Sequence, residues 1–224
     1  MLTLTPEDHA KVTAAVAAAE AETDGEIVTI VARQSDSYHD VALHWAVGVM
    51  LLVLAVLSVW PEVALWLHHR LFANWTEQVP PAEMFAIALL LLALTFLVVR
   101  AILAWTPLRM ALTPGVTKSR RVRRRAVDLF MVGAHNKTRA RTGVLLYLSM
   151  AEHRAEIVAD EAIASRVAPE AWGEAMAALI ADVKDRRPGD GMAAAVQRIG
   201  AILASHFSRS ADDTNELCDR VIEL

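Results

Sequence analysis

The stretch VALHWAVGVMLLVLAVLSVW at residues 41–60 contains no charged residue. As a helix, these twenty residues would extend roughly 30 Å, the thickness of the hydrocarbon core of a bilayer. Trp45 and Trp60 lie near its two ends, as in the aromatic belts of membrane helices. A buried helix of a large soluble protein is the competing interpretation, but the rest of the chain is too short to surround such a helix. We therefore expect a transmembrane helix over residues 41–60.

A second apolar segment runs from residue 84 to residue 106 and is uncharged up to Val99. Arg100 interrupts it near its end, where a long side chain can reach the headgroups; a functional charge within the membrane is the alternative. Beyond this segment the chain carries a block of cations: Lys118, Arg120, Arg121, Arg123, Arg124 and Arg125. The loop between the two segments has a single arginine, Arg70. Because positive segments stay on the cytoplasmic side, the pattern predicts a multi-pass protein with both termini cytoplasmic.

The connecting segment, residues 62–76, is apolar and aromatic. Apolar residues recur every fourth position from Val63 to Leu71, which predicts a short amphipathic helix in the outer membrane interface. Three of its aromatic residues are candidates for contact with a partner membrane protein: Trp66, Phe72 and Trp75. The adjacent pair His68-His69 suggests a metal site only weakly, since neighbouring residues on a helix do not face one point.

The remaining sequence has the alternating pattern of an α/β domain. Strands are predicted at residues 26–33, 144–149 and 155–160, and helices at 6–22, 118–139, 162–167, 169–184 and 191–207. A lone strand is not stable, so the strand before the apolar segments should pair with those after them. We therefore expect one cytoplasmic domain formed by residues 1–40 and 107–224, with a mixed sheet of at least three strands and flanking helices. The transmembrane hairpin, residues 41–106, would be an insertion into it.

The charge of the chain is sorted along the sequence. The net charge is only −4, yet residues 118–141 carry 9 basic residues and 1 acidic residue. Next to a membrane helix, this block is expected to contact anionic lipid and to fix the topology. Nucleic-acid binding is the alternative for such a block, and its juxtamembrane position argues against it. The single cysteine, Cys218, excludes an internal disulfide.

A further pattern is recognisable in the second half of the chain. The run TRARTGVLLYLS at residues 138–149, followed by Glu152 and by IVAD at residues 157–160, resembles the TPM-domain family, also called TPM phosphatase. Residues 24–28 look like the first strand of that family, and residues 213–219 look like the closing segment of a bacterial membrane subgroup with an inserted hairpin. In that subgroup a proline is usual where this chain has Cys218. The resemblance covers about residues 1–36 and 119–224.

The resemblance implies an α/β fold but no single activity. Some plant members of the family are linked to photosystem II repair and to a weak acid phosphatase activity, and an animal member is an accessory protein of an ion channel. Fold alone does not settle function. The resemblance therefore implies assistance to a membrane complex, such as a photosynthetic or respiratory complex or a channel, in the bacterial inner membrane.

Catalysis would require carboxylates that converge. The catalytic candidates are Asp160, Glu161 and Glu26, and the metal candidates are Asp160, Glu161 and Asp36, because strand ends of α/β sheets hold ligands and hard cations prefer oxygen. In the family, the turn at 160–161 lies beside an acidic, calcium-associated cleft. An N-cap of the following helix is the competing interpretation for Asp160.

Other polar groups have plain structural interpretations. Arg33 and Arg141 suit a phosphate, although pairing with nearby carboxylates is the simpler expectation. The cluster at residues 212–216 lacks the glycine and the spacing of an EF-hand loop, which favours a solvated turn. Motifs of serine hydrolases, P-loop NTPases and zinc proteases are missing from the sequence.

These observations predict a non-catalytic accessory, assembly or repair subunit that contacts the lipid bilayer and other membrane protein subunits. A membrane-tethered phosphatase or cation-dependent hydrolase with an acidic cleft is the alternative. No cofactor is predicted, except Ca²⁺ or another divalent cation if the acidic residues form a cleft.

Overall fold

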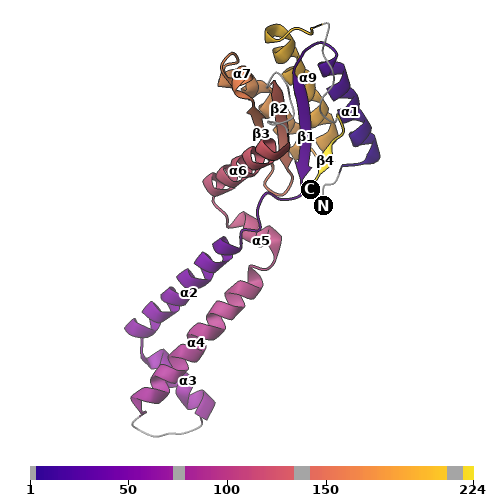
Figure 1. Ribbon diagram of the computed structural model, residues 1–224. Coiled ribbons are helices and arrows are strands. Elements are labelled where there is room, and N and C mark those ends of the chain that lie inside the picture. The colour runs from indigo at the N-terminus through magenta and orange to yellow at the C-terminus, as the bar shows by residue number, and fades with distance from the viewer. Residues whose placement is uncertain (1–3, 73–78, 134–141, 211–218) are drawn as a thin grey trace. The chain divides into compact units, whose positions relative to one another are not determined.

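The computed structural model describes residues 4–72, 79–133, 142–210 and 219–224 (Figure 1). The chain forms two compact units: Met1–Ser37 together with Gly115–Leu224, and Tyr38–Pro114. The first unit contains a four-stranded sheet and its helices, and the second consists of helices. Each unit is described separately below.

The sheet is mixed and has the order β3-β2-β1-β4. Its strands are β1 (Glu26–Ala32), β2 (Gly143–Ser149), β3 (Arg154–Ala159) and β4 (Ile222–Glu223). β1 is parallel to β2 and to β4, while β2 and β3 form an antiparallel pair. The predicted α/β fold with a mixed sheet and flanking helices is therefore confirmed, and the strand before the apolar segments pairs with one after them.

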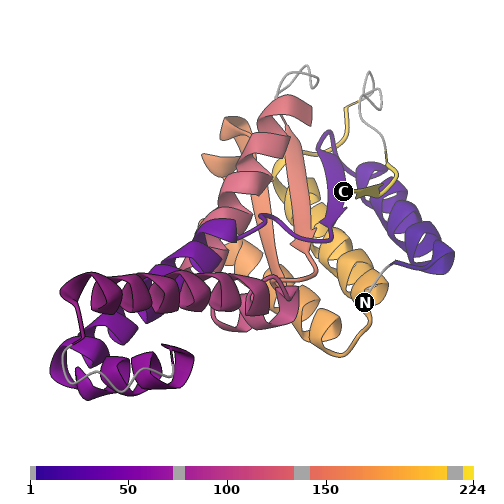
Figure 2. The ribbon, with the colours of Figure 1, turned by 90° about the horizontal axis from the view of Figure 1, so that it is seen from below.

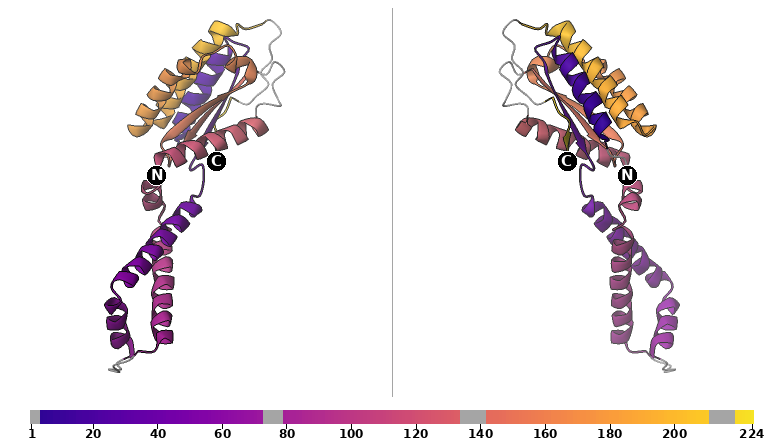
Figure 3. Two further views of the ribbon diagram at one scale, coloured as in Figure 1. Left: turned by 90° about the vertical axis from the view of Figure 1, so that its left-hand side faces the viewer. Right: turned by 90° about the vertical axis from the view of Figure 1, so that its right-hand side faces the viewer.

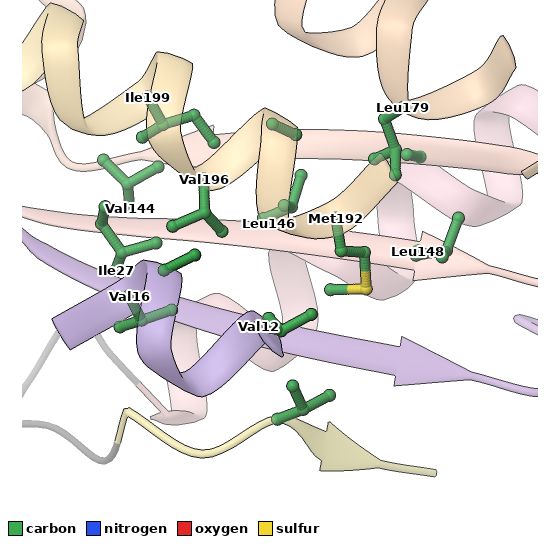
Figure 4. Close-up of a cluster of buried hydrophobic side chains, with 14 of the residues drawn as sticks. Val12, Val16, Ile27, Val144, Leu146, Leu148, Leu179, Met192, Val196 and Ile199 are labelled. Atoms are coloured by element: carbon green, nitrogen blue, oxygen red, sulfur yellow. The ribbon is translucent and has the colours of Figure 1, made fainter. Parts of the chain in front are cut away.

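The strands place alternate side chains on two covered faces, as period-two geometry requires. On one face, Ile27, Val144 and Leu146 pack against α1 (Pro6–Glu20), α8 (Gly173–Lys184) and α9 (Pro188–His206) (Figure 4). On the other, Val28 and Leu145 pack against α6 (Gly115–Gly133). Figure 2 shows α6 and the α1 and α9 helices on opposite sides of the sheet. Strands buried on both faces explain why β1 and β2 are almost entirely apolar.

The local start of the first helix follows the sequence. Thr5 caps α1: its hydroxyl accepts from the Asp8 amide at 3.1 Å, and the Asp8 carboxylate accepts from the Thr5 amide at 2.9 Å. This reciprocal pair is a capping box, with Pro6 at the first helical turn.

Several boundaries differ from the prediction. The segment predicted as one helix over 169–184 is a 3₁₀ turn (Pro169–Trp172) followed by α8, and the short helix α7 is Glu161–Ala164. β4 was missed because its two residues lie in a polar tail without a strand pattern. It is held by reciprocal backbone bonds: the Arg33 amide donates to the Leu224 carbonyl and the Leu224 amide to the Val31 carbonyl, both at 2.9 Å.

The second unit contains α2 (His39–Val59), α3 (Glu62–Phe72), α4 (Pro81–Ile102) and the short α5 (Thr106–Ala111). α2 and α4 lie side by side, and α3 packs against both (Figure 3). The predicted second helix, 84–106, starts earlier, at Pro81, and ends at Ile102, because the backbone becomes extended at Trp105 before α5 begins at Thr106. The predicted interfacial helix, 62–76, is described only as far as Phe72.

Candidate functional site

Two of the predicted catalytic carboxylates lie at one end of the sheet. Glu26 begins β1 and is paired in register with Gly143, the first residue of β2. Asp160 follows β3, which runs antiparallel to β2, so it reaches the same end. Glu26 and Asp160 are both buried, with Asp160 only 2% exposed, whereas Glu161 is exposed.

Asp160 forms two hydrogen bonds that join the end of the edge strand β3 to Gly143 of β2. Its Oδ2 accepts from the Gly143 amide at 3.0 Å, and its own amide donates to the Gly143 carbonyl at 3.0 Å. It occupies the position before α7, but its side chain makes no cap bond to that helix. Asp160 is thus the N-cap residue of α7 by position, as the competing interpretation expected, but its carboxylate ties β3 to the start of β2 and does not cap the helix.

The metal candidates do not converge. Asp36 follows the carboxyl end of β1, whereas Asp160 lies at the amino end. The seven residues of β1 separate these ends by about 20 Å at ~3.3 Å per residue. Within the ranges that the structure describes, no three His, Cys, Asp or Glu side chains are grouped to hold a metal ion. The combination of Asp160, Glu161 and Asp36 as one metal site is wrong for this geometric reason. Arg141, residues 212–216 and Cys218 lie outside the described residues.

A buried polar network that the sequence analysis missed lies at the carboxyl end of β1 and β2. The Ser35 amide donates to Glu152 Oε1 at 2.9 Å, and the Ser35 hydroxyl lies 3.0 Å from the Tyr147 hydroxyl. The Ser149 hydroxyl donates to Glu152. Burial is the main cause that raises the pKa of the Tyr147 phenol, and the Glu152 carboxylate adds to it. The available signal was a tyrosine and a serine inside an otherwise apolar strand.

This network fastens the segment that leaves the sheet. We call residues 33–37 the exit segment, because they lead from β1 to the second unit. The Ala151 amide donates to the Arg33 carbonyl at 3.0 Å, and the Asp36 carboxylate lies 3.0 Å from Arg121 Nη1 of α6. In the polar network of Ser35, Tyr147, Ser149 and Glu152, the hydroxyl and carboxylate groups are hydrogen-bonded to each other or to the backbone. Such a network is suited to structural support.

The basic helix α6 uses one side for packing. Val122, Ala126 and Phe130 recur every fourth residue and are buried against the sheet. Arg123 lies on the flank and forms an ion pair of 3.6 Å with Glu156 of β3. Burial raises the pKa of Glu156, and the charges of Arg123 and Arg154 oppose that rise. Beside this pair lies an open hollow of about 530 Å³, lined by Val116, Ser119, Arg120, Arg123, Arg124, Val127, Asp128 and Glu156.

The second unit exposes apolar side chains instead of burying them. α2 and α4 are long and apolar enough to cross a membrane, with mean hydropathies of 2.3 and 2.7 over their most apolar windows. Only 17% and 6% of those windows are buried, respectively, which argues against the core helices of a soluble protein. Large apolar residues such as Leu52 and Leu90 are exposed along both helices.

Two polar contacts join helices of the second unit. Arg100 Nη1 lies 3.5 Å from the carbonyl of His39, the first residue of α2, which places Arg100 level with that end. His68 Nε2 of α3 lies 2.7 Å from the Glu83 carboxylate of α4. Among the predicted partner contacts, Trp66 is 63% exposed, and the Phe72 side chain and Trp75 lie outside the described residues.

The fold defines a mixed α/β domain with a basic helix on one face. Residues 107–202, from α5 into α9, match the model of the family described as the TPM domain. The sequence resemblance is thereby confirmed for a segment that covers less than half of the chain. A structure of similar fold is the NMR structure of the BA42 protein from the psychrophilic bacterium Bizionia argentinensis, with a TM-score of 0.56 and 17% identity over 99% of this chain and 95% of that one. At this identity, the likeness concerns the fold alone. The comparison with curated proteins finds no match.

Proposed function

We propose that this chain is a membrane-anchored TPM-domain protein that serves as a non-catalytic accessory, assembly or repair subunit of a larger membrane complex. Its α2 and α4 would span the bacterial cytoplasmic membrane, with both termini in the cytoplasm. The observation that carries the proposal is the exposed apolar surface of these two helices. Apolar patches of that extent are unstable in water and mark contact with lipid or with another protein.

The ends of the helix pair support a membrane placement. Trp45 and Trp105 are exposed near the end of the pair that contains Arg100, and Trp60 and Trp66 are exposed near the other. Such a distribution fits two aromatic belts. The position of Arg100 beside His39 favours an arginine that reaches the interface over a functional charge within the membrane.

Membrane insertion is tested by alkaline carbonate extraction of cell membranes, which removes peripheral proteins. The chain should stay in the pellet and enter solution only with detergent. Topology is tested by reporter fusions at the C-terminus and in the loop after α3. A carbonate-soluble chain, or an external C-terminus, would contradict the placement.

The accessory role is tested by extraction in mild detergent and identification of the proteins that copurify. Trp66→Ala should weaken the association with partner subunits while leaving the chain in the membrane. Leu52→Ala is a matched control, since Leu52 is also 63% exposed but lies in α2. A chain that always runs alone would refute the accessory role.

A phosphatase or cation-dependent hydrolase is the alternative, and the arrangement of the candidate residues favours it less. Asp160 already accepts a backbone hydrogen bond, and Asp36 lies at the other end of the sheet. Hydrolysis of a phosphate ester by the purified chain, with and without Ca²⁺ or Mg²⁺, tests it. Turnover lost in Glu161→Gln but retained in the exposed control Glu170→Gln would revive the alternative.

A further inference from the structure

The outward side of α6 carries a second stripe, distinct from the buried one. We define the outer stripe as Val116, Arg120, Arg124, Val127 and Met131. These residues follow each other at intervals of three or four, so they share one face of the helix. Val116 is 78% exposed, and Val127 and Met131 are also exposed. A soluble helix presents mainly charged and polar residues on that face, so three exposed apolar side chains aligned there need an explanation.

The arginines of the outer stripe are available for an anionic ligand. Arg121 pairs with Asp36 and Arg123 pairs with Glu156, whereas Arg120 and Arg124 form no ion pair with any residue in the described part of the chain. They lie one turn apart on the same face, and a guanidinium binds phosphate oxygens through two parallel hydrogen bonds. The hollow that they border is wide open, which suits a surface more than an enclosed small molecule.

We propose that the outer stripe docks on a bilayer surface of anionic phospholipids, with Arg120 and Arg124 on the lipid phosphates and the apolar side chains in the interface. Cations interleaved with exposed apolar residues are the composition of helices that lie on anionic membranes. The inference rests on the proposed membrane insertion of α2 and α4. Gly115 follows the end of α4 at Ile102 by thirteen residues, six of which form α5, so this connection reaches at most about 35 Å. Under that insertion, α6 is within reach of the headgroups.

The experiment uses the full chain, reconstituted in nanodiscs of phosphatidylcholine alone or of phosphatidylcholine mixed with phosphatidylglycerol. Cys218→Ser removes the single cysteine, and Val127→Cys then carries an environment-sensitive fluorophore on the outer stripe. The emission should shift to the blue in the anionic nanodiscs and return in high salt, which screens exposed charges. The same fluorophore at Ala177→Cys, on the exposed side of α8, should not respond to the lipid.

Charge variants separate the outer stripe from general basicity. Arg120→Gln with Arg124→Gln should abolish the difference between the two lipid compositions. Lys184→Gln with Arg198→Gln, which removes the same charge from α8 and α9, should retain it. Both pairs are exposed, so neither exchange should prevent folding.

The outcomes distinguish the inference from the function on which it rests. A chain that does not enter nanodiscs overturns the proposed membrane anchoring, and this inference with it. A chain that enters them but gives the same emission in both lipids, or in both charge variants, overturns the inference alone. That second result would indicate that the outer stripe binds an acidic protein partner and not the lipid surface.

Discussion

Arg121 Nη1 lies 3.0 Å from Asp36 Oδ2, and this ion pair joins the two chain segments that border the apolar insertion. Asp36 belongs to the exit segment before the insertion, and Arg121 lies in α6 after it. An inserted unit separates its flanking segments in sequence, so the host domain must hold them together by its own contacts. Here the pair acts with the Ser35–Glu152 bond, which fixes the preceding residue of the exit segment.

We predict that loss of this pair loosens the exit segment more than it destabilises the domain. Asp36 is 40% exposed, so a double-mutant cycle of Asp36→Asn and Arg121→Gln should give a coupling free energy of about 0.5 kcal/mol. Hydrogen exchange of the Ser35 amide should be faster in either variant. The exposed pair Lys11–Asp190, at 3.1 Å, is the control, and its removal should leave the Ser35 amide unchanged. A coupling indistinguishable from zero would contradict the prediction.

The contact between α1 and α9 gives a second prediction. A Cβ added at Gly200 would lie 2.5 Å from the Ala19 Cβ and 3.2 Å from its Cα, so the two helices would have to separate. Gly200→Ala should therefore lower the free energy of unfolding by about 1–3 kcal/mol, measured by urea denaturation in detergent. Gly173→Ala is the matched control, since nothing lies within 4 Å of its added Cβ. It should stabilise the protein by about 0.4–1 kcal/mol through the entropy of the unfolded chain. Equal effects of both exchanges would refute this account.

Much of the fold was predictable because the strongest signals are local. The uncharged run at residues 41–60 indicates a helix, and the β-branched residues of β1 indicate a strand, each from the local sequence alone. The pairing of β1 with β2 followed from the instability of a lone strand. β4 was not predictable, because its two residues gain strand geometry only from the neighbouring β1.

The candidate site was harder to predict because convergence depends on strand direction. Sequence reasoning grouped Asp36 with Asp160 as strand-end carboxylates, but the antiparallel β3 returns Asp160 to the opposite end. The Ser35–Tyr147–Glu152 network joins residues more than a hundred positions apart, and no local pattern reveals such a contact. The two arginines of the outer stripe, in contrast, already belong to the predicted basic block, whereas the exposure of Val116, Val127 and Met131 beside them is seen only in the structure.

Glu156 provides a pH-dependent prediction. Burial raises the pKa of Glu156 above its ordinary value of 4.5, and Arg123 and Arg154 only partly offset this rise. The folded state therefore holds the proton more tightly than the unfolded state, and the charged carboxylate lowers stability at neutral pH. As the pH falls through the raised pKa, the Glu156 carboxylate becomes protonated, and its destabilising effect on the folded wild type disappears.

Glu156→Gln should thus be neutral or stabilising by a few tenths of a kcal/mol at pH 7. Its advantage over the wild type should shrink towards pH 4, which urea denaturation at both pH values will measure. Glu161→Gln, at an exposed position, is the control and should show no such trend. A marked loss of stability in Glu156→Gln at pH 7 would mean that the ion pair with Arg123 outweighs the burial cost.

The apolar face of α4 allows the membrane proposal to be separated from the folding of the α/β domain. Leu90 and Leu94 lie one turn apart near the middle of α4 and are 61% and 55% exposed, respectively. An arginine near the centre of a membrane helix costs about 3 kcal/mol for insertion, so Leu90→Arg with Leu94→Arg should cost on the order of 6 kcal/mol. The variant should leave the carbonate-resistant membrane fraction, while Leu90→Ala with Leu94→Ala stays in it. Because α4 belongs to the second unit, the circular dichroism of the detergent-purified variant should keep the signal of the sheet. A doubly arginine-substituted chain that remains carbonate-resistant would show that these exposed leucines face something other than lipid.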